Sequence, residues 1–163
     1  MISKKMQNAL NEQIKHELFS SHLYLAMSSW CEAANFPGFA KWLRVQYKEE
    51  REHAEKYFDD LLDQGATATV PAVEAPVAKF KSVLDIFQQV VAHEKKITAL
   101  VNKLQALAHE EGDWATQGLL GWFVQEQVEE EKHAGLLAAH LEMIGDKSAA
   151  ILNLDHNAGK RAS

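Results

Sequence analysis

The segment from Gln46 to Tyr57 places a carboxylate and an imidazole one helical turn apart, at Glu50 and His53. Alternating steps of four and three residues connect Phe39, Leu43, Gln46, Glu50, His53 and Tyr57. This spacing is typical of a helix stripe that faces a partner. A buried carboxylate without a partner is costly, so the segment predicts that a positive charge, such as a metal ion, compensates Glu50.

Three further helical stripes carry polar residues at their centres. Glu17 is the midpoint of a stripe from Met6 to Cys31, and Glu94 is the midpoint of a stripe from Val83 to Ala108. A fourth stripe, from Leu120 to Ile144, has Gln127 and Glu130 at its centre. Four inward carboxylates with one imidazole would form a negatively charged site for about two divalent cations. Such an oxygen-rich set suits iron(II) or manganese better than zinc.

The predicted ligands divide into two sets: Glu17, Glu50 and His53 for one metal, and Glu50 as a bridge, Glu94 and Glu130 for the other. Gln127, one turn from Glu130, is placed to hydrogen-bond a water or oxygen species there. Tyr24, two turns from Glu17, is a candidate hydrogen-bond or electron donor, although an aromatic residue on a core stripe is as often simple packing.

A second ligand set is also compatible with the spacing. Glu130 and His133 repeat the Glu-x-x-His spacing of Glu50 and His53, but the stripe favours Gln127 and Glu130 and leaves His133 at its edge. The remaining histidines fall off the central layer, which favours surface or capping roles. A single buried Glu is often half of an ion pair, but four helices with polar residues at one level favour metal binding.

Three more acidic residues, Glu49, Glu126 and Glu129, flank the central stripes. They fit a further, more exposed cation site beside Glu130. They fit a solvated acidic face equally well on spacing alone.

Composition and the positions of helix-capping residues predict the helices that position these residues. The 163 residues fit one domain and are rich in good helix formers, so we expect an all-α protein. The expected helices cover about 3–35, 37–64, 82–111, 114–144 and 148–157, with Ser82 and Asp113 as candidate N-caps.

The loop of 17 residues from Gly65 to Lys81 determines the expected topology. Fully extended, it reaches up to about 56 Å, more than the roughly 40 Å of a helix of 27 residues. It can therefore cross a bundle of four helices, whereas the short first and third connections form antiparallel hairpins. Glu94 and Glu130 are equally far from the break at Gly112, so they should lie at one depth.

Charge and composition exclude several classes of protein. A net charge of −6 argues against nucleic acid as the main partner. The one cysteine, Cys31, excludes an internal disulfide. The start of the sequence lacks the apolar core of a signal peptide, and no apolar run approaches the roughly 20 residues that span a bilayer. We expect a cytoplasmic protein without a membrane partner.

The sequence resembles the ferritin family, and more closely its bacterial and archaeal non-haem branch. The resemblance covers nearly the whole chain and depends on four segments: NEQIKHELFSSHLYLAM, EEREHA, AHEKKIT and WFVQEQVEEE. It implies a ferritin-like four-helix bundle with one long crossover loop and a short C-terminal fifth helix. It also implies a ferroxidase centre formed by Glu17, Glu50, His53, Glu94 and Glu130, with Gln127 and Tyr24 nearby. It further implies a third iron site formed by Glu49, Glu126, Glu129 and Glu130.

The family's function supplies further expectations. Its members form hollow shells of twenty-four subunits, oxidise iron(II) with dioxygen or hydrogen peroxide, and store ferric mineral. Trp122 matches an aromatic position near the centre. The fifth helix matches the segment that lines the four-fold axes of the shell, with Ile151, Leu152 and Leu154 as packing candidates.

Two other functions are considered as alternatives. One is a soluble di-iron oxidoreductase of the rubrerythrin or bacterioferritin kind, and the other is a non-enzymatic metal-binding bundle. The first is disfavoured because the sequence lacks a Cys-x-x-Cys module, and because Arg51 stands where bacterioferritin would place its haem-ligating methionine. No haem is expected.

Overall fold

The computed structural model describes residues 2–77, 79–145 and 148–160. All regular elements in these ranges are helices: α1 (Lys4–Ala33), α2 (Pro37–Asp63), α3 (Val83–Glu110), α4 (Trp114–Ile144) and α5 (Ser148–Ala158). The prediction of an all-α protein is confirmed.

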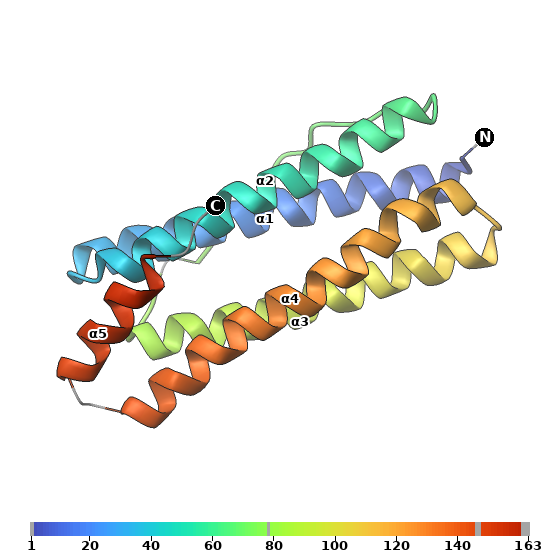
Figure 1. Cartoon of the computed structure of the whole chain (residues 1–163). Coiled ribbons are helices and arrows are strands. Elements are labelled where there is room, and N and C mark those ends of the chain that lie inside the picture. Colours follow the sequence, from blue (N-terminus) through green and yellow to red (C-terminus); the bar gives the residue numbers. More distant parts are fainter. Residues whose placement is uncertain (1, 78, 146–147, 161–163) are drawn as a thin grey trace.

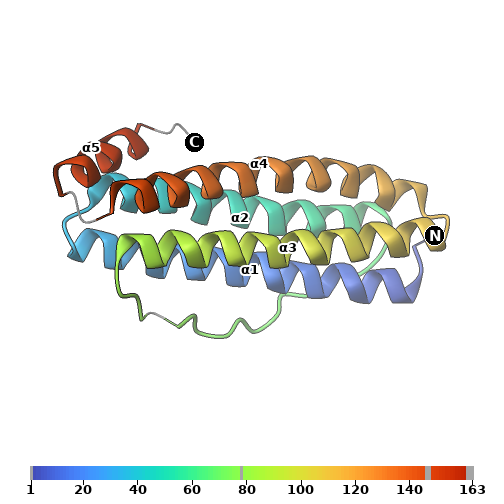
Figure 2. The ribbon, with the colours of Figure 1, turned by 90° about the horizontal axis from the view of Figure 1, so that it is seen from below.

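The first four helices form two antiparallel hairpins, α1 with α2 and α3 with α4 (Figure 1). Figure 2 shows the connection between α2 and α3 running along the outside of the bundle to its opposite end. Asn11 of α1 holds the first part of this connection, because its amide nitrogen donates to the Thr67 carbonyl at 3.2 Å and its Oδ1 accepts from the Thr69 amide at 2.7 Å. The long crossover is thus fixed against α1.

Short polar side chains and left-handed residues set the helix ends. The Ser82 hydroxyl accepts from the Asp85 amide at 3.0 Å, and the Asp113 carboxylate accepts from the Thr116 amide at 3.0 Å. These side chains satisfy amides that have no partner in the first turn of a helix. Gly112, with φ of 66°, reverses the chain between α3 and α4.

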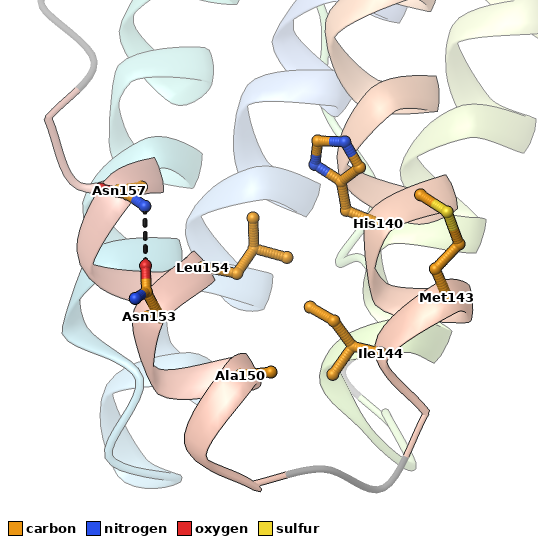
Figure 3. Close-up of a pocket in the computed structure, with 7 residues that line it drawn as sticks. All are labelled: His140, Met143, Ile144, Ala150, Asn153, Leu154 and Asn157. Carbon is orange, nitrogen blue, oxygen red and sulfur yellow. Dashed lines mark hydrogen bonds between the residues drawn. The ribbon is translucent and has the colours of Figure 1, made fainter.

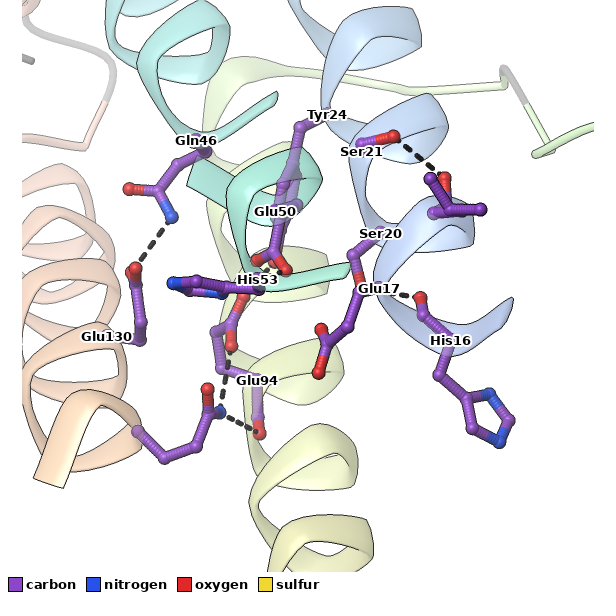
Figure 4. A network of polar contacts seen from close by, with 12 residues as sticks. His16, Glu17, Ser20, Ser21, Tyr24, Gln46, Glu50, His53, Glu94 and Glu130 are labelled. Carbon is purple, nitrogen blue, oxygen red and sulfur yellow. Dashed lines mark hydrogen bonds and ion pairs between the residues drawn. The ribbon is translucent and has the colours of Figure 1, made fainter. Parts of the chain in front are cut away.

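The apolar core is divided into two clusters by a polar layer. One cluster contains Tyr24, Phe39 and Phe87, and the other contains Tyr57 and Phe123. Between them, buried polar side chains from the first four helices point toward one another (Figure 4). The register predicted from the sequence therefore brings four helical stripes to a common depth.

The short helix α5 is attached to the N-terminus of α2. The buried Asp155 carboxylate accepts from the Phe39 amide at 2.7 Å and from the Gly38 amide at 3.1 Å. A Cβ on Gly38 would lie only 1.8 Å from the Asp155 carbonyl oxygen, so this close approach requires glycine. The other side of α5 forms a groove with the end of α4, lined by His140, Met143, Ile144, Ala150, Asn153, Leu154 and Asn157 (Figure 3).

The three apolar residues predicted to pack on α5 differ in exposure. Ile151 and Leu154 are half-buried and contact the cluster that contains Phe39. Leu152 is 56% exposed. It is therefore available for contact with another surface.

Candidate metal centre

The polar layer at mid-bundle gathers ligands from all four long helices. Its titratable members are Glu17 on α1, Glu50 and His53 on α2, Glu94 on α3 and Glu130 on α4, all at most 4% exposed. Figure 4 shows these side chains converging between the helices. The helical stripes place them there because each is flanked by apolar positions that must face the core.

Three of these residues already have the spacing of a metal site. One ligand atom from each of Glu17, Glu50 and His53 lies within 4.8 Å of the other two. The distance from His53 Nδ1 to Glu50 Oε2 is 3.5 Å. Among the residues that the structure describes, a search for three or more potential ligands at this spacing finds this group.

The hydrogen bonds of these carboxylates are incomplete. Glu17 Oε1 accepts from the Gln13 side chain at 2.8 Å, but Glu17 Oε2 and Glu50 Oε2 are buried without a hydrogen-bond partner. Buried polar atoms in native proteins usually have partners. Two carboxylate oxygens without a hydrogen-bond donor, one of them 3.5 Å from His53 Nδ1, fit a divalent cation, which takes oxygen and nitrogen ligands together.

Electrostatics lead to the same conclusion. Burial, followed by the nearby Glu50 carboxylate, raises the pKa of Glu17 well above its usual range. Burial, followed by the charges of Glu94 and Glu130, raises the pKa of Glu50. Without a cation, these groups therefore hold protons that they would lose in water, and a bound cation would favour their charged forms.

Glu94 and Glu130 are held by neutral hydrogen-bond donors. The Tyr24 hydroxyl donates to Glu94 Oε1, and the Gln127 amide donates to Glu94 Oε2 at 3.1 Å. The Gln46 amide donates to Glu130 Oε2 at 2.8 Å. Neutral donors orient the carboxylates without neutralising them, so their charges stay available for a cation.

Gln46 and His93 support the centre through contacts that helical spacing does not predict. The spacing predicts Gln46 as a stripe residue, and in the structure its side chain also orients Glu130. His93 is one of the histidines that the spacing places off the central layer. In the structure its ring packs edge-on against Tyr24 at 5.8 Å and its Nε2 lies 2.7 Å from the Ser20 hydroxyl. Burial lowers the pKa of His93 to about 4. The His93 imidazole is therefore neutral near pH 7, and it packs against Tyr24 without adding a charge.

The remaining candidates lie farther out. Glu49 and Glu126 are half-buried, Glu129 is exposed, and none of them belongs to the Glu17–Glu50–His53 group in the described chain. His133 is exposed and lines a groove beside α5 with Trp42 and Lys160. The geometry thus favours the ligand set without His133.

Trp122 forms the outer wall of the centre. Its indole meets the His53 ring edge-on at 5.5 Å, and its other contacts include Phe123 at 4.9 Å. The Lys56 ammonium lies 4.6 Å from the indole centroid. Because Trp122 is 41% exposed, it separates His53 from solvent rather than belonging to the dry core.

The fold and the buried carboxylate–histidine group define the class of ferritin-like metal-binding bundles. A family model described as "Ferritin-like domain" matches residues 7–144. The chain belongs to the ferritin family.

Relatives and solved structures place the chain in the non-haem branch. It is 38% identical to the "Bacterial non-heme ferritin" of Staphylococcus aureus strain USA300, over 99% of this chain and 97% of the relative. An open pore ferritin from the archaeon Archaeoglobus fulgidus shares 40% identity, with a TM-score of 0.98 and 99% coverage of both chains. A structure described as "Humanized Archaeal ferritin" is 38% identical, with a TM-score of 0.98, and covers 99% of this chain and 98% of its own.

These findings confirm the predicted family, the ferritin-like bundle and its function as an iron-storage ferroxidase. The buried Glu17, Glu50 and His53 group has the spacing to hold a metal ion. None of the helices in the described ranges is long and apolar enough to cross a membrane.

Proposed function

We propose that the chain binds two iron(II) ions at once in the polar layer and oxidises them with dioxygen or hydrogen peroxide. The observation that carries this proposal is the pair of buried oxygens without a hydrogen-bond partner, Glu17 Oε2 and Glu50 Oε2, beside His53. In this proposal Glu17, Glu50 and His53 hold the first ion. Glu50 bridges to the second ion, which Glu94 and Glu130 hold.

The chain's own residues prepare this reaction. Two iron(II) ions supply two electrons, which reduce dioxygen to hydrogen peroxide, or hydrogen peroxide to water, with the uptake of two protons. The carboxylates release protons when the cations bind, because only the charged forms are ligands. Gln127 and Tyr24 keep Glu94 oriented through their hydrogen bonds to its two oxygens.

The acidic residues beside the centre fit a role in iron transfer. Glu49 is near enough to contribute to the raised pKa of Glu50. We assign Glu49, Glu126, Glu129 and Glu130 to a third iron site. Its greater exposure suits an ion that is passed on rather than held.

The assembly is also part of the proposal. The whole chain acts as one domain and forms a hollow homo-oligomeric shell of twenty-four subunits in the cytoplasm, with ferric oxo-hydroxide stored inside. Support comes from the high structural similarity to the archaeal ferritin over its full length. Neither nucleic acid nor a membrane is required as a partner.

The test adds iron(II) in air to the purified protein and follows oxidation and mineral growth by absorbance. We expect Glu50→Ala and His53→Ala to slow the initial oxidation by about 100-fold or more, because each removes a predicted ligand. Glu52→Ala, an exposed carboxylate on the same helix, is the matched control. Parental rates in both ligand variants would show that the centre is wrongly assigned, and size-exclusion chromatography separately tests the shell.

A further inference from the structure

Tyr57 lies one helical turn beyond His53 on α2, and its ring is fixed in place. It is fully buried and stacks on Phe123 of α4, with ring centroids 4.0 Å apart and an interplanar angle of 9°. Phe123 in turn meets the His53 ring edge-on at 5.6 Å. The stack therefore prevents the Tyr57 hydroxyl from turning toward solvent.

The Tyr57 hydroxyl is buried without a hydrogen-bond partner. The other two tyrosines differ in this respect. The Tyr24 hydroxyl donates to Glu94, and the Tyr47 hydroxyl accepts from the Arg51 side chain at 3.4 Å. A buried phenol that only packs is replaced by phenylalanine at no loss, so the unpaired hydroxyl requires an explanation.

Unpaired acceptors are found in the adjacent polar layer. Glu17 Oε2 and Glu50 Oε2 have no hydrogen-bond partner either. Burial, and then the charges of Glu17 and Glu50, raise the pKa of Tyr57, so the phenol lies within the electric field of both carboxylates. The carboxylate oxygens are suited to bind a cation directly. The phenol is a donor and is suited to an oxygen atom that the cation carries.

The two buried tyrosines approach the centre from opposite sides. Tyr24 belongs to the apolar cluster with Phe39, whereas Tyr57 belongs to the cluster with Phe123, and the polar layer lies between them. Tyr24 is already engaged by Glu94, a ligand predicted for the second ion. On the side that holds the first ion, the Gln13 amide donates to Glu17 Oε1. Of the two buried tyrosines in the described chain, Tyr57 is the one that lies on this side.

We propose that the Tyr57 hydroxyl donates a hydrogen bond to an oxygen ligand of the iron(II) ion held by Glu17, Glu50 and His53. That ligand is a water molecule or the oxidant, both of which present an acceptor oxygen. The inference rests on the proposed function of the same site. It makes Tyr57 a catalytic residue of the centre rather than a core aromatic alone.

The first experiment uses cobalt(II), a divalent cation stable in air, as the probe and records tyrosine ultraviolet difference spectra. We expect cobalt(II) to perturb tyrosine absorbance in the parent, and a defined part of this change to be lost in Tyr57→Phe. Tyr47→Phe is the matched control on the same helix and should retain the full change. Tyr24→Phe should lose a different part, because its hydroxyl contacts Glu94.

The second experiment measures initial iron(II) oxidation in air and anaerobic iron(II) affinity. Tyr57→Phe should oxidise iron about tenfold more slowly, as expected for losing one donor in a dry site, while its affinity stays within about twofold. Circular dichroism and size-exclusion chromatography check the fold. A higher melting temperature of the metal-free variant is expected, because the unpaired hydroxyl is gone.

The outcomes separate the two proposals. Loss of the cobalt signal together with slower oxidation is the expected result. Loss of the cobalt signal with parental oxidation would overturn the catalytic role of Tyr57 and leave only a hydrogen bond to bound water. An unchanged cobalt spectrum in Tyr57→Phe overturns the inference, whatever the oxidation rate. If instead the parent oxidises no faster than Glu50→Ala, the proposed function fails while the cobalt spectra still decide the role of Tyr57.

Discussion

Buried carboxylates occur in two regions of this molecule, and their surroundings differ. At the junction of α5 with α2, both oxygens of Asp155 accept backbone amides, at 2.7 and 3.1 Å. At mid-bundle, Glu17 and Glu50 each keep one buried oxygen without a hydrogen-bond partner. The carboxylates are buried in both regions, but only at the junction does each carboxylate oxygen accept a hydrogen bond.

This difference separates structural from functional burial. The free amides at the N-terminus of α2 and its positive dipole end stabilise the Asp155 carboxylate, so the junction contributes to stability. At the centre, Glu17 Oε2 and Glu50 Oε2 lack such donors, and their burial lowers stability until a cation binds. Substitutions in the two regions should therefore have opposite effects on the metal-free protein.

The largest effect on stability is expected from Asp155→Ala. Removing this carboxylate leaves the Gly38 and Phe39 amides without their partner, which should lower the free energy of unfolding by about 3 kcal/mol. Urea or thermal unfolding measures the change. His156→Ala, an exposed neighbour on α5, is the control. Unchanged stability in Asp155→Ala would mean that α5 is held by its apolar contacts alone.

The opposite sign is expected from Glu17→Gln. In the metal-free protein the buried Glu17 carboxyl must keep a proton that the unfolded chain releases, and this costs stability. Glutamine has the same shape without this cost, so the metal-free protein should gain about 1–2 kcal/mol of stability. Iron oxidation should fall at the same time, because a neutral amide is a poor ligand. Glu12→Gln, on an exposed position of α1, should change neither property. A loss of stability in Glu17→Gln would show that the Glu17 carboxyl stabilises the metal-free protein, as the Asp155 carboxylate is expected to do.

The stability of the metal-free protein should also depend on pH. The native state raises the pKa of Glu17 above 4.5, so above that pH the folded protein holds a proton that the unfolded chain releases. Stability is therefore greatest below the unfolded pKa and falls as pH rises toward the folded pKa. The slope is at most about 1.4 kcal/mol per pH unit for each such carboxyl.

Manganese(II) should reverse this trend, since it binds the charged carboxylates more strongly as protons leave. Melting temperatures measured across pH, with and without manganese(II), test both statements. The slope of the metal-free protein should be smaller in Glu17→Gln. Parallel pH profiles with and without the cation would contradict the assignment of the layer as a metal site.

The sequence predicts the polar layer better than it predicts the contacts around it. Helical periodicity locates Glu17 and Glu50 on inward stripes, because a stripe depends only on residues of one helix. The contact of Asp155 joins residues 116 and 117 positions apart, and no local pattern encodes it. The missing partner of Tyr57 is likewise visible only when all neighbouring helices are in place.

The smallest effect is expected at the partly exposed edge of the centre, from Lys56→Met. The Lys56 ammonium lies over Trp122, and an exposed contact of this kind contributes about 0.5 kcal/mol. Methionine retains the aliphatic packing, so unfolding should change by no more than that amount and iron oxidation should stay within about twofold. Lys48→Met, an exposed lysine on the same helix, gives the baseline.

A larger effect of Lys56→Met on oxidation would show that Trp122 must be held against His53 for the centre to work. Trp122 is 41% exposed and contacts His53 through ring edges, which position the imidazole but neutralise no charge. A partly wet contact of this kind changes the energy of the centre little, because water replaces what the variant removes. The contrast between Asp155 and Glu17 therefore depends on complete burial, where no water can take the place of a missing partner.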